Sequence, residues 1–178
     1  MLSPILSKST CADCKFCCSF RRTSLWETPV FPAADLPKFQ KLNPEARFKP
    51  AGKDSFTFDL TGSYKSSDAA EEAPCPFLDP RRGCTLPPDL KPFECKIWPL
   101  RAVRIVETVQ TGSSGPVTLA VALTPTCPAI NKVSPQKINS LVASGLGQQI
   151  LDYAADHPDI IKDSSDFLSN IIYPPEKI

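Results

Sequence analysis

The sequence predicts a single α+β domain: a small antiparallel sheet with long Pro-rich coil organised around a cysteine metal site, and a C-terminal helix packed on one face. Three observations favour this fold. Eight cysteines fall into two groups, 20 prolines outnumber 7 glycines, and the last third of the 178 residues carries apolar side chains at helical spacing. Many prolines indicate fixed turns and irregular connections. We expect one domain over 1–178, with a metal core at 11–128 and a helical part at 134–172.

The first half of the chain predicts one short helix and one strand. Leu36, Phe39 and Leu42 follow helical spacing, although a proline limits this helix to one or two turns. The stretch "DSFTFDL" at 54–60 alternates apolar and polar residues, which is typical of a half-buried strand. The polar stretch 61–73 is interpreted as an exposed loop.

The middle of the chain is irregular up to a predicted hairpin. Seven prolines within 74–100 exclude a long helix or a central strand, so the three cysteines of this stretch are expected to hold it together. The β-branched runs at 101–110 and 116–124 flank "TGSSG" and predict an antiparallel hairpin.

The C-terminal part predicts a long helix. Ser134 and Pro135 suit its N-cap and first turn, and its apolar face continues to about residue 153. Gly145 and Gly147 weaken it by about 1 kcal/mol each relative to alanine, which indicates a kink or close packing there. A second helix is expected over 164–172.

Composition excludes several classes of protein. A net charge of +1, with no run of Lys and Arg longer than two, argues against a nucleic-acid partner. No stretch has the roughly 18 consecutive apolar residues of a membrane span, and the start lacks the features of a secretory signal. We therefore expect a cytoplasmic protein whose thiols are reduced and bind metal rather than form disulfides.

The cysteines themselves predict a metal centre. The first group has the spacing of two overlapping Cys-x-x-Cys turns followed by an adjacent pair, and the second group is spread out, with two of its members followed by proline. A Cys-x-x-Cys turn presents two thiolates to one ion. Adjacent side chains in an extended segment diverge, so Cys17 and Cys18 are expected to serve different irons or different metals, or to be one ligand and one buried thiol. The candidate ligands are Cys11, Cys14, Cys17, Cys18, Cys75, Cys84, Cys95 and Cys127.

Other catalytic apparatus is scarce. The only histidine, His157, is expected at the surface or at a helix end, so any metal site must be built from thiolates. The two tryptophans, Trp26 and Trp98, are expected mainly in core packing. The spacing favours an iron–sulfur cluster, expected to be of the [4Fe–4S] type, over zinc, which usually takes two separated Cys-x-x-Cys turns. Eight thiols would supply one four-iron cluster with spare thiols, or two mononuclear or dinuclear sites.

Three separated motifs resemble those of the YkgJ-type CxxCxxCC family of zinc- or iron-chelating domains. They are "CADCKFCC" at 11–18, "CPFL" at 75–78 with the Gly-Cys step at 83–84, and "KPFECKIWP" at 91–99, where Lys91 stands in place of the commoner arginine. A later Cys-Pro at 127–128 is also similar. The resemblance covers about 11–130 and implies metal binding. One branch, the flagellin lysine N-methylases, uses an iron–sulfur cluster together with S-adenosylmethionine.

Three functions remain open from the sequence. The first is a metalloprotein that holds an iron–sulfur cluster in a redox, sensing or other cluster-dependent role. The second is an S-adenosylmethionine-dependent enzyme that methylates a protein substrate, as the resemblance to the methylase branch implies. The third is a zinc-stabilised interaction module. The sequence leaves open whether the chain is an enzyme and, if so, whether it is a methyltransferase or an oxidoreductase.

Overall fold

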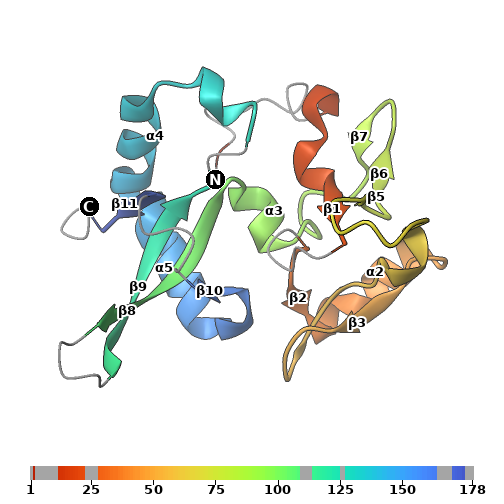
Figure 1. Cartoon of the computed structure of the whole chain (residues 1–178), viewed down its shortest axis with the longest axis horizontal. Coiled ribbons are helices and arrows are strands. Elements are labelled where there is room, and N and C mark those ends of the chain that lie inside the picture. Colours follow the sequence, from red (N-terminus) through yellow and green to blue (C-terminus); the bar gives the residue numbers. More distant parts are fainter. Residues whose placement is uncertain are drawn as a thin grey trace. The chain divides into compact units, whose positions relative to one another are not determined.

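The computed structural model describes residues 2, 12–22, 28–108, 114–124, 127–163 and 170–174. The chain divides into two compact units (Figure 1). We call Leu6–Lys96 the cysteine unit, and Met1–Ile5 with Ile97–Ile178 the hairpin unit. The expected mixed α+β architecture, with small antiparallel sheets and a C-terminal helix, is confirmed. Among the described residues, no helix has both the length and the apolar character that crossing a membrane requires.

The cysteine unit contains three small antiparallel sheets, with strand orders β1-β5, β2-β4-β3 and β6-β7. Its short elements reflect the many prolines, as the sequence predicts. They are η1 (Phe16–Cys18), β1 (Ser19–Arg21), β2 (Phe31–Pro32), η2 (Ala33–Asp35), α2 (Leu36–Leu42), β3 (Phe48–Pro50), β4 (Ser55–Phe58), η3 (Thr61–Ser63), β5 (Glu72–Pro74), β6 (Leu78–Asp79), β7 (Gly83–Cys84) and α3 (Phe93–Ile97).

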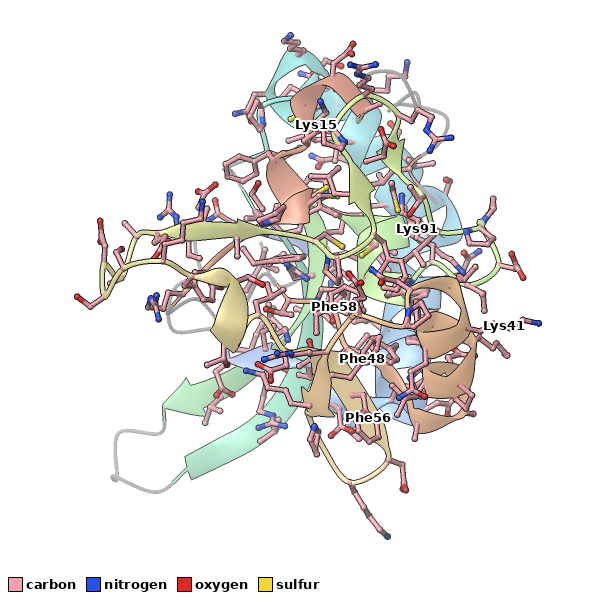
Figure 2. All side chains as sticks on the ribbon, turned by 90° about the vertical axis from the view of Figure 1, so that its right-hand side faces the viewer. Lys15, Lys41, Phe48, Phe56, Phe58 and Lys91 are labelled. Carbon is pink, nitrogen blue, oxygen red and sulfur yellow. The ribbon has the colours of Figure 1, made fainter. Side chains whose placement is uncertain are left out.

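An aromatic core holds these elements together. Phe39 on α2 is fully buried, and its ring lies 4.4 Å from Phe31, 5.6 Å from Phe77 and 6.3 Å from Phe58, measured between centroids. Figure 2 shows Phe58 and Phe48 in this core, with centroids 6.1 Å apart. Cys75 belongs to the same buried cluster. The cysteine segment is therefore anchored to the aromatic core.

Two details of the predicted helix and strand are wrong. Leu42 ends α2 with 48% of its surface exposed, so only Leu36 and Phe39 face the core. Strand β4 is the central strand of its sheet, and its polar Ser55 and Thr57 are buried rather than solvated. Thr57 is accommodated because its hydroxyl donates to the Pro29 carbonyl at 2.8 Å. Alternation along one strand cannot show that a neighbouring segment covers its polar face.

The hairpin unit is a four-stranded sheet covered by helices. The strands follow the order β10-β8-β9-β11, all antiparallel except the β10–β8 pair, and α5 packs against β8 and β9 (Figure 1). The elements are β8 (Leu100–Thr108), β9 (Ser114–Leu123), η4 (Ile130–Lys132), α4 (Pro135–Leu141), a π-helical turn η5 (Val142–Leu146), α5 (Gly147–Asp156), η6 (Pro158–Ile160), β10 (Lys162–Asp163) and β11 (Ile171–Tyr173).

The predicted hairpin and long helix are confirmed. The prediction of a second helix over 164–172 is wrong for the part of this range that the structure describes, 170–172. Ser134 caps α4 by accepting the Lys137 amide, as expected. Ile171 and Tyr173, however, lie in β11, which pairs with β9, while 164–169 and most of the "TGSSG" turn lie outside the described residues. Two adjacent isoleucines favour a strand, and β9 offers an edge for pairing. His157 caps the end of α5 and stacks on Tyr153, with centroids 4.2 Å apart.

The two glycines of the long helix are suited to their positions for different structural reasons. Gly145 has φ 121° inside the π-helical turn, a conformation that only glycine adopts readily, and it produces the expected kink. Gly147 lies against the Tyr173 ring, so that an added Cβ would come within 2.6 Å of its Cγ. The close packing inferred from the sequence therefore belongs to Gly147.

We predict that Gly147→Ala destabilises the hairpin unit although alanine is the better helix former. The clash with Tyr173 should cost about 1–3 kcal/mol, which outweighs the ~1 kcal/mol gained in helix propensity. Urea unfolding of the two single variants and the double variant Gly147→Ala/Tyr173→Ala measures the coupling. If the ring is the cause, Gly147→Ala stabilises the protein in the Tyr173→Ala background; the same loss in both backgrounds would contradict this cause.

Candidate functional site

The first cysteine segment is joined to the second group through a small sheet. Residues 12–14 are helical, Lys15 takes the left-handed conformation (φ 53°), and η1 follows with the Cys18 amide donating to the Lys15 carbonyl at 2.9 Å. Strand β1 then pairs with β5, so that Ser19 lies opposite Pro74. The Cys75 amide donates to the Cys18 carbonyl at 2.7 Å. Cys18 and Cys75, which are distant in the sequence, therefore lie side by side.

The β6–β7 hairpin brings Cys84 to the same place. Cys84 pairs with Leu78 in the hairpin. Gly83 approaches the first segment so closely that an added Cβ would lie 3.0 Å from the Cα of Ala12, and its φ of 80° also favours glycine. The Lys15 ammonium donates to the Pro80 carbonyl in the connecting turn. The hairpin is thus held against the "CADCKFCC" segment at both ends of that turn.

Helix α3 supplies Cys95, and its first turn carries a buried carboxylate, Glu94. Glu94 is 2% exposed and accepts a hydrogen bond from the Val30 amide at 2.6 Å. Lys91 precedes the helix, and its backbone amide donates to the Pro87 carbonyl at 3.0 Å. Figure 2 labels Lys91 and Lys15, the two lysines on the loops that carry the thiols.

Five thiols lie within electrostatic range of Lys91. Burial alone would lower the pKa of Lys91, but the charges of nearby thiolates raise this pKa above its usual value. These thiolates are Cys84, Cys95, Cys17 and Cys18. Lys91 in turn opposes the rise in the pKa of Cys75. The chain thus gathers the sulfurs of three separate segments around one cation.

The thiols also repel one another when ionised. Burial, with smaller contributions from Cys84 and Cys17, raises the pKa of Cys75 to about 12. Cys95 keeps part of its residue surface exposed, yet desolvation of its thiol, followed by the charge of Cys75, raises its pKa well above the usual value. Ionisation of Cys75 and Cys95 is therefore disfavoured without a further positive charge nearby.

The expected divergence of Cys17 and Cys18 is wrong. They end a 3-10 turn rather than an extended segment, and their side chains are hydrogen-bonded to each other. This bond, ahead of burial, raises the pKa of Cys17. The turn forms because Lys15 adopts a left-handed conformation, which the sequence does not signal at a lysine. The two side chains are therefore close to each other rather than on opposite sides of an extended segment.

The other predicted ligands have different positions. Cys14 is half-buried in the cysteine unit, Cys11 lies outside the described residues, and Cys127 is buried in the hairpin unit. The seven described cysteines are free thiols. Within the described ranges, which leave out Cys11, no group of three or more His, Cys, Asp or Glu side chains has the arrangement of a metal site.

Trp26 also lies outside the described residues, and Trp98 stacks under Arg101, 4.5 Å from its guanidinium.

Sequence reasoning missed the central position of Lys91 and the anchoring by Glu94. The only signal for Lys91 was its place in the "KPFEC" motif, where arginine is commoner. The signal for Glu94 was a carboxylate beside a cysteine, and such charges usually face water. Neither residue type nor spacing shows that a backbone amide 64 positions away binds this carboxylate.

A carboxylate also organises the loop that leads to Cys75. Glu71 accepts hydrogen bonds from the amides of Lys65 (2.6 Å) and Ser66 (2.8 Å), and from Arg22 (3.1 Å). The two amide bonds are the main cause that lowers the pKa of Glu71 to about 2. This loop closes against β1 through the antiparallel β1–β5 pair.

We predict that Glu71→Gln lowers stability and flattens its dependence on acid pH. Because the pKa of Glu71 is lower in the folded state than its usual 4.5, its contribution is fully present above pH 4.5 and is lost as the pH falls towards 2. Urea unfolding at several pH values measures this. Glu72→Gln is the control, since its ion pair with Arg21 is long (3.5 Å) and exposed. An equal response of both variants between pH 4.5 and 2 would contradict the prediction.

Comparison of the chain with protein-family models, with curated proteins and with solved structures found no match. The site is therefore interpreted from its own residues.

Proposed function

We propose that this chain is a cysteine-cluster metalloprotein that holds an iron–sulfur cluster in its cysteine unit. The observation that carries the proposal is that Cys18, Cys75 and Cys84 pack together in the cysteine unit, and that these thiols, with Cys17 and Cys95, lie within electrostatic range of Lys91. Free cysteines in an ordinary core are single, small hydrophobic residues. Five of them gathered from three segments, around a lysine, are typical of a ligand set.

The donor set fits a thiolate-bound metal. Burial and the neighbouring thiols raise the pKa of Cys75 and Cys95, so each of these sulfurs needs a positive partner when it ionises, and a metal ion provides one. Cys11 and Cys14 from the same segment complete the proposed set in this unit. The Cys-Pro at 127 remains a predicted ligand, and its test is given in the Discussion. Lys91 would offset part of the negative charge of a thiolate-bound cluster.

Iron–sulfur is preferred to zinc because the thiols form one dense group with solitary distant partners. Structural zinc sites usually take two Cys-x-x-Cys turns in a closed tetrahedral set of four. A bound cluster would supply one-electron transfer, with a potential set by charge, hydrogen bonds and solvent exposure around the sulfurs. The half-buried Cys84, Cys18 and Cys17 leave such a group partly accessible. A redox or sensing role follows.

The test is purification without oxygen, followed by an absorption spectrum and analysis of iron, sulfide and zinc. We expect a brown protein with a broad visible band and about four irons per chain. A colourless protein with stoichiometric zinc would replace the cluster with a zinc-stabilised module. Absence of both metals, with the thiols paired as disulfides, would overturn metal binding altogether.

A further inference from the structure

A second site lies in the cysteine unit, in a pocket that shares no residue with the thiol group. The pocket has a volume of about 200 Å³ and is lined by residues from β1, β3, β4 and the loop that follows. Its lining contains three cations and no carboxylate. The lining residues are Arg21, Arg22, Thr28, Lys49, Phe58, Leu60, Thr61 and Tyr64.

The cations are positioned before any ligand binds. The Arg22 guanidinium stacks on the Tyr64 ring at 4.6 Å, and its Nη2 atom donates to Glu71 and to the Ser66 carbonyl. The Tyr64 hydroxyl is itself held by the Phe20 carbonyl at 3.1 Å. Arg21 has only a long, exposed ion pair with Glu72. A rigid arginine loses little entropy when it binds an anion.

The remaining lining determines the kind of ligand. Phe58 and Leu60 are only 1% and 6% exposed, so they close the pocket from the core side and offer a ligand little apolar surface, whereas Thr61 and Thr28 add hydroxyl groups. Since a water occupies about 30 Å³ of liquid, a pocket of about 200 Å³ has room for a small molecule but not for a nucleotide. A cation such as S-adenosylmethionine would be repelled by the lining.

We propose that this pocket binds a small anion, with its phosphate or carboxylate group at Arg22, Arg21 and Lys49. The test is calorimetric titration of the full chain, with whatever metal it carries, using phenyl phosphate and benzoate. The two probes distinguish a phosphate from a carboxylate ligand. Benzyl alcohol is the neutral control of similar size.

A pair of lysine variants locates the binding. Lys49→Gln removes a cation of the pocket, while Lys53→Gln makes the same change in the β3–β4 turn outside its lining. We expect at least one anion to bind, benzyl alcohol not to bind, and Lys49→Gln to weaken the anion by about tenfold, the usual loss for a charged hydrogen bond. Lys53→Gln should stay within about twofold, as surface charges outside a site usually do.

Three results would overturn the proposal. They are no binding of either anion, equal binding of benzyl alcohol, and an equal loss in the two lysine variants, which would indicate a general charge effect. The ¹⁵N resonance of Arg22 Nε, followed in the same titration, should shift as the ligand saturates the site, because it reports on the environment of the Arg22 guanidinium. Anion binding is measured independently of iron or zinc content. A failure to bind an anion would therefore not contradict the proposed metal centre, and absence of metal would not contradict the anion site.

Discussion

Cys84→Ser is expected to reduce the iron of the purified protein from about four atoms per chain to less than one, if the proposed cluster is present. Serine is a poor ligand for the soft metals that thiolates bind. Cys84 is positioned by the β6–β7 hairpin, and the Gly83–Ala12 contact holds that hairpin against the first cysteine segment. Its replacement changes one donor and leaves this backbone arrangement intact.

The same variant should lose most of the stability of the cysteine unit. The unit has short elements and many prolines, so a metal centre would supply much of its folding free energy, on the order of 10 kcal/mol for a structural thiolate site. Iron analysis and urea unfolding measure both effects. Thr85→Ser is the control, because it changes the next residue of the hairpin yet keeps the hydroxyl that donates to the Phe77 carbonyl. Wild-type iron and stability in Cys84→Ser would contradict the cluster.

Cys127→Ser, measured beside Cys84→Ser, tests the predicted ligand in the hairpin unit. Cys127 is 4% exposed there. If it is a ligand, the variant loses iron as Cys84→Ser does. If it is a small core residue, the iron content stays unchanged and only the hairpin unit is weakened slightly. The two units can be followed separately by amide hydrogen exchange.

Phe39→Ala is expected to lower the free energy of unfolding by about 3–5 kcal/mol. The side chain has no exposed surface, and its ring contacts those of Phe31, Phe77 and Phe58. Removing the ring leaves a cavity at the centre of the core that also contains Cys75. Urea unfolding at constant metal content measures the loss.

Leu42→Ala is the matched control for this prediction. Leu42 lies on the same helix, but 48% of its surface is exposed, so its replacement should change stability by less than about 0.5 kcal/mol. Equal losses in the two variants would mean that α2 contributes through helix propensity rather than through the aromatic core. A loss at Phe39 accompanied by reduced metal content would link that core to the cysteine segments.

Local signals in the sequence are sufficient where the fold depends on neighbours in the chain. Helix α4 begins after Ser134 because a serine side chain accepts an amide of the first turn. The β8–β9 hairpin follows from two β-branched runs around a short turn. The spacing of the cysteines by itself indicates a shared site, and Cys18, Cys75 and Cys84 do lie in one unit.

What the sequence alone determined about this protein is therefore its α+β class, its main helices and hairpin, and the candidate thiols. Tertiary structure decided the rest: the pairing of Ile171 with β9, the burial of Thr57, the hydrogen bond between Cys17 and Cys18, and the place of Lys91 among the thiols. Each of these depends on a partner distant in the chain or on a rare backbone conformation at Lys15. Periodicity and spacing report the local preferences of a segment, whereas burial and charge depend on which other segment covers it.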